Sequence, residues 1–269
     1  MSLQQEIIAA LGVKPSIDPE QEIRRRVDFL KEYVVGAGAS GLLIAISGGI
    51  DSAVAAGLCK RATDELTQEK GQEYITLGVF QPYAEQSDIS HSYEVAEAFQ
   101  LTHRVETNIA EAVDELALEV EHSLKGIGIS RHLGRGVKGN IKARTRMVAQ
   151  YALAGELNLL VVGTDHASEA ITGFYTKWGD GAVDITPLST LNKRQVRQLA
   201  AVLGVPLSVQ EKAPTAGLWE GQTDENELGI KYDDNSAYLE GKEIPAEARE
   251  LLEKQFRKTQ HKRSPIPGI

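Results

Sequence analysis

Short apolar runs alternate along the chain with longer segments in which apolar residues recur every three or four positions. Three of the runs predict buried strands, at Leu42–Ile46, 74–80 and 157–164. Helical segments stand between them. Strands that alternate with helices build parallel sheets covered on both faces. The pattern therefore predicts a single α/β domain over residues 1–269 with a Rossmann-like, doubly wound parallel sheet.

Cap and turn signals set the limits of the predicted helices. Asp18 before Pro19 begins one helix, with Gln21 placed to reach back to the cap, and Asn192 begins another that Gly204 ends. Further helices are predicted over 87–100, 109–124 and 141–156, and a short strand over 103–107. Two turn-rich segments, about 126–140 and about 205–224, are predicted to be mobile loops.

Residues 45–54, AISGGIDSAV, place two glycines and several small polar side chains between the first strand and an Ala-rich helix. A tight strand-to-helix turn of this kind directs backbone N–H groups and the positive end of the helix dipole at one point. Such a point favours a bound phosphate. Gly48 and Gly49 allow the backbone to approach anionic oxygens. Neither G-x-x-x-x-G-K-[ST] nor G-x-G-x-x-G is present at this turn, which excludes the commoner phosphate-binding loops there.

Asp51 is unusual beside a phosphate, because a carboxylate repels it. A Mg²⁺ ion between the two removes the conflict, since this hard cation bridges carboxylate and phosphate oxygens. The alternative is that Asp51 and Ser52 only stabilise the first helical turn, by about 0.3–1 kcal/mol, but this leaves the double glycine without a purpose. A second polar turn, GTDHASE at 163–169, also follows a strand. We expect both turns to face one crevice beyond the carboxyl ends of the strands.

Composition and charge limit the class of protein. The 269 residues carry a formal net charge of −9, which disfavours a large nucleic-acid footprint but permits a small phosphorylated ligand. The single cysteine, Cys59, excludes an internal disulfide framework and a Cys-based zinc site, and we expect it to be buried. No run approaches the roughly 20 apolar residues of a membrane span, and the start lacks signal-peptide features. We expect a cytoplasmic protein without nucleic-acid or membrane partners.

The turn sequence S-G-G-x-D-S resembles the signature of the N-type ATP pyrophosphatases, which cleave ATP between its α and β phosphates. Residues 140–147, 161–196, 212–218 and 259–263 resemble the ammonia-dependent NAD synthetases of that group, and the resemblance runs nearly end to end. It implies an adenine nucleotide alpha hydrolase-like fold. It also implies ATP-dependent amidation of nicotinic acid adenine dinucleotide (deamido-NAD) by ammonia, the last step of NAD biosynthesis. The products are NAD, AMP and pyrophosphate, formed through an acyl-adenylate.

The resemblance implies roles for individual residues, besides a Mg²⁺ ion and a homodimer whose second subunit completes the cleft. The implied ATP contacts are Ala45, Ile46, Ser47, Gly48, Gly49, Ile50, Asp51, Ser52, Thr164, Lys193 and Thr215, with Asp51 and Glu169 as Mg²⁺ ligands. The implied deamido-NAD contacts are Arg144, Lys177, Asp184, His261 and Lys262. Asp180 matches an aspartate suggested in the family to take a proton from ammonium, and an Asx turn before Gly181 is the alternative.

Several of these residues also suit ordinary structural positions. Glu169 and Arg144 suit a solvated helix surface, and His261 with Lys262 suits a frayed basic tail. His166 has no second His or Cys spaced for a metal, so we interpret it as structural or adjacent to the site. Gln81 stands where the family usually has an arginine, which removes one charge that a nucleotide would meet.

Two other functions share parts of this pattern. A tRNA-modifying pyrophosphatase would carry the same S-G-G-x-D-S turn, but the acidic balance and the lack of a paired sulfur-carrying cysteine weigh against it. A non-catalytic nucleotide-binding module is the second alternative. Consumption of ATP with release of pyrophosphate would exclude it.

Overall fold

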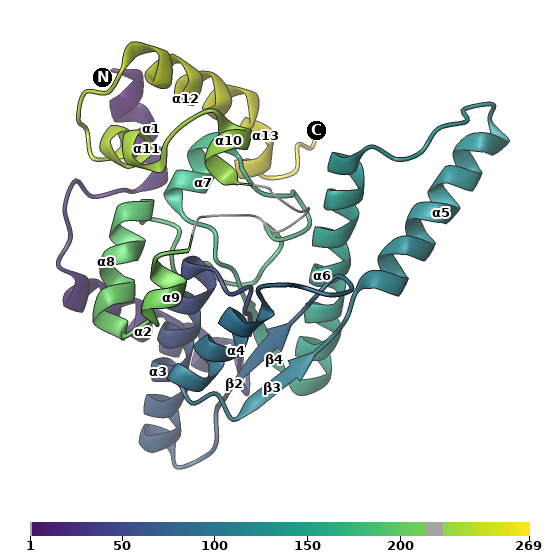
Figure 1. The fold of residues 1–269 in the computed structure, drawn as a ribbon. Coiled ribbons are helices and arrows are strands. Elements are labelled where there is room, and N and C mark those ends of the chain that lie inside the picture. Colours follow the sequence, from purple (N-terminus) through teal and green to yellow (C-terminus); the bar gives the residue numbers. More distant parts are fainter. Residues whose placement is uncertain (1, 213–222) are drawn as a thin grey trace.

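A parallel sheet of four strands, in the order β3-β2-β1-β4, forms the centre of the molecule (Figure 1). This computed structural model describes residues 2–212 and 223–269. The strands are β1 (Gly41–Ala45), β2 (Ile75–Phe80), β3 (His103–Glu106) and β4 (Leu159–Val162). The predicted α/β fold with a parallel sheet is confirmed, and each predicted strand is present.

The strand register places the carboxyl ends of β1 and β4 side by side. Ile44 of β1 lies opposite Val162 of β4. A parallel bridge between Val162 and Ile185 continues this edge beyond β4. The turns that follow β1 and β4 therefore begin next to each other, as expected for neighbouring parallel strands.

Helices cover both faces of the sheet, because successive residues of a strand point to opposite faces. Leu42 and Ile44 pack against α2 (Pro19–Ala37), α3 (Ile50–Lys70) and α8 (Lys193–Leu203), in the cluster that also holds Cys59. Leu43 faces the other side, towards α6 (Arg135–Leu157). All three strand residues are fully buried, and burial of such a side chain contributes about 1.5–3 kcal/mol. The expectation that Cys59 is buried is confirmed.

A separate apolar cluster joins the first helix of the chain to helices near its other end. It contains Ile7 of α1 (Leu3–Leu11), Ile171 of α7 (Ala167–Thr172) and Leu252 of α12 (Ala246–Lys258), together with side chains of α11 (Tyr232–Leu239). Figure 1 shows α1 beside α11 and α12. Because α7 belongs to this cluster, both terminal segments help to position the helix that carries Glu169.

Parts of both predicted loops are helical, and five further helices complete the described fold. These helices are α4 (Ile89–Ala98), α5 (Ala110–Gly126), α9 (Leu207–Gln210), α10 (Asp224–Leu228) and α13 (Gln260–Arg263). Residues 135–140, predicted as loop, form the first turns of α6, where Lys138 pairs with Asp114 of α5 at 2.7 Å. The segment 205–224 contains α9, and its residues 213–222 lie outside the described residues. The mobility of both segments stays a prediction.

Side-chain caps mark the start of α2 and α8, but not that of α4. Asp18 accepts a hydrogen bond from the Gln21 N–H, and the Gln21 side chain reaches back to the Asp18 carboxylate. Asn192 caps α8 as predicted. Asp88 precedes α4 without a side-chain cap, because its carboxylate pairs with Lys212 and Gln86 instead. Among the helices of the described ranges, none is long and apolar enough to cross a membrane.

Candidate active site

The turn between β1 and α3 is held together by its own serines. The Ser52 hydroxyl accepts a hydrogen bond from the Ser47 N–H at 3.2 Å and donates one to the Gly49 carbonyl at 2.9 Å. Gly48 has a φ of 74°, and a Cβ there would lie 3.0 Å from His91 Cβ, so this position requires glycine. The two serines therefore fix the shape of the turn, and they begin α3 at Ile50.

Three side chains that could hold a cation meet at the first turn of α3. Asp51 Oδ1 lies 3.3 Å from His166 Nε2, which lies 3.7 Å from Glu169 Oε1. The three candidate ligand atoms all lie within 4.8 Å of one another. Asp51 follows β1, whereas His166 and Glu169 follow β4, so the adjacent ends of these strands bring the group together.

Lys193 places a positive charge against this group. Its Nζ donates a hydrogen bond to Asp51 Oδ2 at 2.7 Å and lies 5.0 Å from the centre of the Tyr232 ring. Burial opposes ionisation of Asp51, but Lys193 and His166 outweigh it and hold the pKa of that carboxyl well below its usual range. Burial raises the pKa of Glu169 to about 8, and the Asp51 carboxylate adds to that effect. One carboxylate is thus charged and the other holds a proton at neutral pH.

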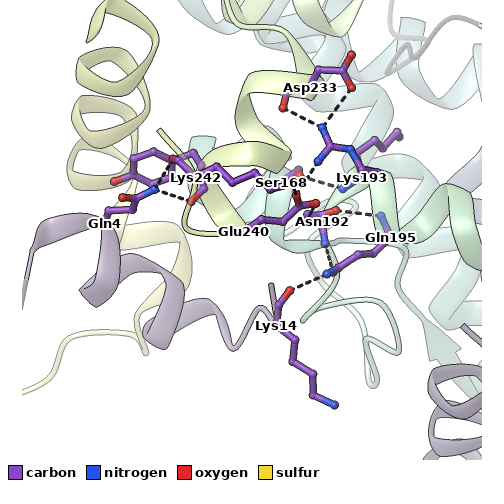
Figure 2. Close-up of polar contacts among 11 residues, drawn as sticks. Gln4, Lys14, Ser168, Asn192, Lys193, Gln195, Asp233, Glu240 and Lys242 are labelled. Carbon is purple, nitrogen blue, oxygen red and sulfur yellow. Dashed lines mark hydrogen bonds and ion pairs between the residues drawn. The ribbon is translucent and has the colours of Figure 1, made fainter. Parts of the chain in front are cut away.

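The position of Lys193 is fixed by hydrogen bonds at the start of α8 (Figure 2). Its backbone N–H donates to the Ser168 hydroxyl at 3.0 Å, which ties α8 to α7. Asn192 and Gln195 cap each other reciprocally, and Asn192 Nδ2 also donates to Glu240 Oε1 at 3.1 Å. These groups are almost fully buried. Removing one of them would leave a buried polar atom unpaired, which costs about 1–3 kcal/mol.

A second group of cations surrounds residues 173–181. Lys262 Nζ donates to the carbonyls of Gly173 and Tyr175, and Lys177 Nζ donates to the His261 carbonyl at 2.7 Å. Arg144 of α6 donates to the Lys177 carbonyl at 3.1 Å. Residues 261 and 262 are therefore docked on this segment, and the alternative of a frayed tail is wrong for Lys262.

Comparison with known proteins decides the family. Residues 22–266 match the protein family described as NAD synthase. The chain belongs to the NAD synthase family. An NH(3)-dependent NAD(+) synthetase of Bacillus thuringiensis (strain Al Hakam) is 46% identical over 266 residues, which is 98% of this chain and 96% of that protein. The same figures hold for a relative from Bacillus anthracis with the same name.

Solved structures of similar proteins support this membership. An NAD+ synthetase from Burkholderia pseudomallei has a TM-score of 0.82 and 34% identity, and the match covers 97% of this chain and 95% of that one. An NMN synthetase from Francisella tularensis has a TM-score of 0.84 and 33% identity, with 94% of this chain and 99% of that one covered. The family fold therefore extends over nearly the whole chain.

Most residues expected to serve the NAD synthase reaction lie at the junction of β1 and α3, in the group around Asp51, or around residues 173–181. Ala45 ends β1, the Ile46 N–H donates to the Val79 carbonyl at 2.9 Å, and Thr164 follows β4 on the adjacent turn. Asp184 differs, because its two carboxylate oxygens accept from the Tyr151 hydroxyl and the Val161 N–H. Asp184 holds the 183–185 segment against β4. Thr215 lies outside the described residues. The ligand contacts themselves stay predictions.

Two features of the site were not visible in the sequence. His166, interpreted as structural or adjacent to the site, lies between Asp51 and Glu169, and a pattern of His or Cys spacing could not find a partner carboxylate on a distant helix. Gln81 is buried and bonds α6: its Nε2 donates to the Arg146 carbonyl at 3.0 Å, and its Oε1 accepts from Gln150. The amide therefore joins the end of β2 to α6.

Proposed function

We propose that this protein amidates deamido-NAD with ammonia at the expense of ATP and forms NAD, AMP and pyrophosphate. The observation that carries the proposal is the group of Asp51, Lys193 and Glu169, in which Asp51 of the S-G-G-x-D-S turn meets side chains of α7 and α8, in a chain that belongs to the NAD synthase family. The two carboxylates can hold a cation, and the ammonium group beside them can offset phosphate charge, as binding of a nucleoside triphosphate with its cation requires. The family relatives named NH(3)-dependent NAD(+) synthetase support ammonia as the nitrogen source.

The reaction consists of two exchanges of bonds. An oxygen of the nicotinate carboxylate attacks the α-phosphorus of ATP. The bond from this phosphorus to the oxygen that bridges the α and β phosphates breaks, and pyrophosphate leaves. Ammonia then attacks the acyl carbon, AMP leaves, and the nitrogen loses a proton. Neither exchange needs a covalent bond to the protein, so the chain has to position the substrates and stabilise charge. Lys193, fixed at the start of α8, is suited to offset the charge of the departing pyrophosphate.

Asp51 and Glu169 are the residues that would hold Mg²⁺. Asp51 Oδ1 is buried and has no hydrogen-bond partner among the described residues, so it can accept a cation without losing another contact. A cation would also replace the proton on Glu169, whose pKa is raised to about 8 by burial. Mg²⁺ bound there would neutralise charge on the phosphate oxygens. These donors fit a hard divalent cation.

The second group of cations suits the nicotinate half of deamido-NAD. Lys177, Lys262 and Arg144 lie around residues 173–181, the segment that also carries Asp180. Each of the three already donates to a backbone carbonyl, which fixes its position without neutralising its charge. We propose that these charges hold the carboxylate and phosphates of deamido-NAD, and that Asp180 takes a proton from ammonium.

We further propose that the protein acts as a homodimer in the cytoplasm. The proposal is supported by the family resemblance and by the size of a cleft that must take ATP and a dinucleotide together. Sedimentation at micromolar concentration should give a dimer. A monomer at the working concentration of the enzyme would contradict it.

The deciding experiment is incubation with ATP, Mg²⁺ and ammonium, followed by mass analysis for NAD, AMP and pyrophosphate. One sample receives deamido-NAD and the other receives nicotinic acid mononucleotide, because one similar structure is that of an NMN synthetase. We expect the dinucleotide to be the better substrate. Preferential amidation of the mononucleotide would change the substrate assignment, and hydrolysis of ATP without either amide would contradict the function.

A further inference from the structure

The His166 imidazole is fully buried between two carboxylates that it does not hydrogen-bond. Its Nε2 lies 3.3 Å from Asp51 Oδ1 and 3.7 Å from Glu169 Oε1. Within the described ranges, both ring nitrogens and Asp51 Oδ1 have no hydrogen-bond partner. An unpaired buried polar atom costs about 1–3 kcal/mol, so a purely structural histidine at this place would be expected to bond a neighbour. A cation bound between these atoms would give both Nε2 and Oδ1 a partner.

The spacing of the three atoms is that of ligands around one ion. Two ligands about 2.1 Å from an octahedral ion are about 3.0 Å apart when adjacent and about 4.2 Å apart when opposite. The 3.3 Å distance from His166 Nε2 to Asp51 Oδ1 matches adjacent ligands after a contraction of a few tenths of an ångström, and the 3.7 Å distance to Glu169 Oε1 lies between the adjacent and opposite spacings. All three pairs of candidate ligand atoms lie within 4.8 Å, which is close enough for one ion to reach all three after small side-chain movements.

The backbone and the neighbouring lysine both favour this arrangement. His166 precedes α7 in extended conformation, with φ −131° and ψ 168°, and Glu169 lies in the first turn of the same helix. Both side chains therefore come from one helix end. Lys193 contacts Oδ2 of Asp51 and leaves Oδ1 on the side of His166. Since no partner of Nδ1 in the described part of the chain fixes the tautomer, Nε2 can present its lone pair.

We infer that His166 is a third protein ligand of this metal site, through Nε2, and that the site binds Mn²⁺ and Co²⁺ more tightly than Mg²⁺. Mg²⁺ strongly prefers oxygen ligands, whereas imidazole nitrogen is a good ligand for first-row transition metals. The inference rests on the metal of the proposed function but concerns a ligand that Mg²⁺ itself would use poorly. A pure Mg²⁺ site would need only Asp51, Glu169 and substrate oxygens.

The test is pulsed electron paramagnetic resonance of the full-length protein with Mn²⁺ and pyrophosphate. Pyrophosphate contains no nitrogen, so any nitrogen bound to Mn²⁺ comes from the protein. We expect echo modulation from a directly bound imidazole nitrogen. Its frequencies should change when the protein is labelled with [15N]histidine. Absence of histidine coupling, or absence of Mn²⁺ binding at millimolar concentrations, would overturn the inference. This measurement on the unaltered chain needs no variant to fold.

Variants then identify the histidine. In His166→Asn the modulation should disappear, and the affinity for Co²⁺ measured by calorimetry should fall at least about tenfold. Mutation of residues that only hydrogen-bond a metal ligand already lowers metal affinity about 10–100-fold. The affinity for Mg²⁺ should change less. His122→Asn is the matched control, since His122 is exposed on α5, and it should keep the modulation. Modulation that survives in His166→Asn would contradict the assignment. Because no turnover is measured, this inference can fail while NAD formation is confirmed, and the reverse.

Discussion

Lys193 Nζ lies 2.7 Å from Asp51 Oδ2, although 142 positions separate the two residues along the chain. The Lys193 side chain is only 2% exposed, so the carboxylate is the main charge that compensates its ammonium group. Loss of one partner of such a buried pair leaves the other charge uncompensated, which costs about 3–5 kcal/mol. The contact therefore links the stability of the fold to the charge of the site.

A double-mutant cycle should measure this link. Asp51→Asn and Lys193→Gln should each destabilise the protein in urea unfolding, and the double variant should lose at least about 1 kcal/mol less than the sum, because the residues are in contact. Asp51→Asn should also slow NAD formation about 10²–10³-fold. The control cycle uses Lys60 and Asp64, a more exposed pair on the same helix, where coupling should stay below about 0.5 kcal/mol. Equal coupling in both cycles would contradict the argument.

Gly173 should be intolerant of a side chain because of its contact with Thr259. Its φ is +67°, and an added Cβ would lie 2.4 Å from Thr259 Cβ. Gly173→Ala should cost about 2–5 kcal/mol, of which about 1–2 is left-handed backbone strain and about 1–3 is overpacking. The KM for deamido-NAD should rise, because Thr259 precedes the docked Lys262.

Gly71→Ala is the matched control for this change. Gly71 has the same φ of +67°, and an added Cβ there meets no described atom within 4 Å. It should cost only about 1–2 kcal/mol, from strain alone, with an unchanged KM. Thermal unfolding and initial rates of both variants would test the difference, and equal losses of stability would show that Thr259 is not the cause.

Glu22 should give stability that depends on pH. Its carboxylate bonds Arg26, which is almost fully buried, and Lys14 at 2.7 Å. Burial alone would raise the pKa of Glu22, but these cations outweigh it and lower the pKa below 4.5. The unfolded chain then binds more protons than the native one in this range. The stabilisation is therefore present above about pH 4.5 and is lost as the pH falls through the lower, native pKa.

Glu22→Gln should accordingly cost about 3 kcal/mol at pH 7, the lower end for a broken buried pair. The difference from the unaltered protein should shrink below pH 4.5, where the unfolded chain takes up a proton that the native carboxylate still lacks, until the pH has passed the lower, native pKa. Glu20→Gln, an exposed change in the same helical turn, should cost less than about 1 kcal/mol. Urea unfolding between pH 3 and 7 would measure the stability of both variants. A stability difference between the unaltered protein and Glu22→Gln that grows as the pH falls would contradict the prediction.

Asp180→Asn should separate the two halves of the reaction. Asp180 Oδ1 accepts the Thr176 N–H at 3.0 Å, and an asparagine oxygen can keep this bond while losing the capacity to accept a proton. Pyrophosphate formation in a single turnover without ammonia should stay near normal, whereas amide formation should slow about 10²–10⁴-fold. The defect should shrink as the pH rises, because free ammonia becomes abundant. A loss of adenylation that ignores pH would assign Asp180 to the turn alone.

The sequence was sufficient to predict those elements whose structure is determined by residues within one short segment. The apolar run before the S-G-G-x-D-S turn gave β1, and the capping pattern of Asn192 and Gln195 gave the start of α8. Contacts between distant segments were not visible in the same way. Residues 135–140 are helical although they are rich in glycine, and Lys138 there pairs with α5. His166 joins the carboxylates because β1 and β4 are neighbours, a pairing that no short sequence pattern encodes.

The pairing of β1 with β4 also has a consequence for biosynthesis. While the chain is being made, β1 and β2 leave the ribosome well before β4, so one apolar edge of the nascent sheet stays without its neighbour. At about 5–20 residues per second this interval lasts several seconds. Long-range parallel pairing is also slow to form during refolding. Helix content should thus return during refolding before the chain regains the ability to bind ATP.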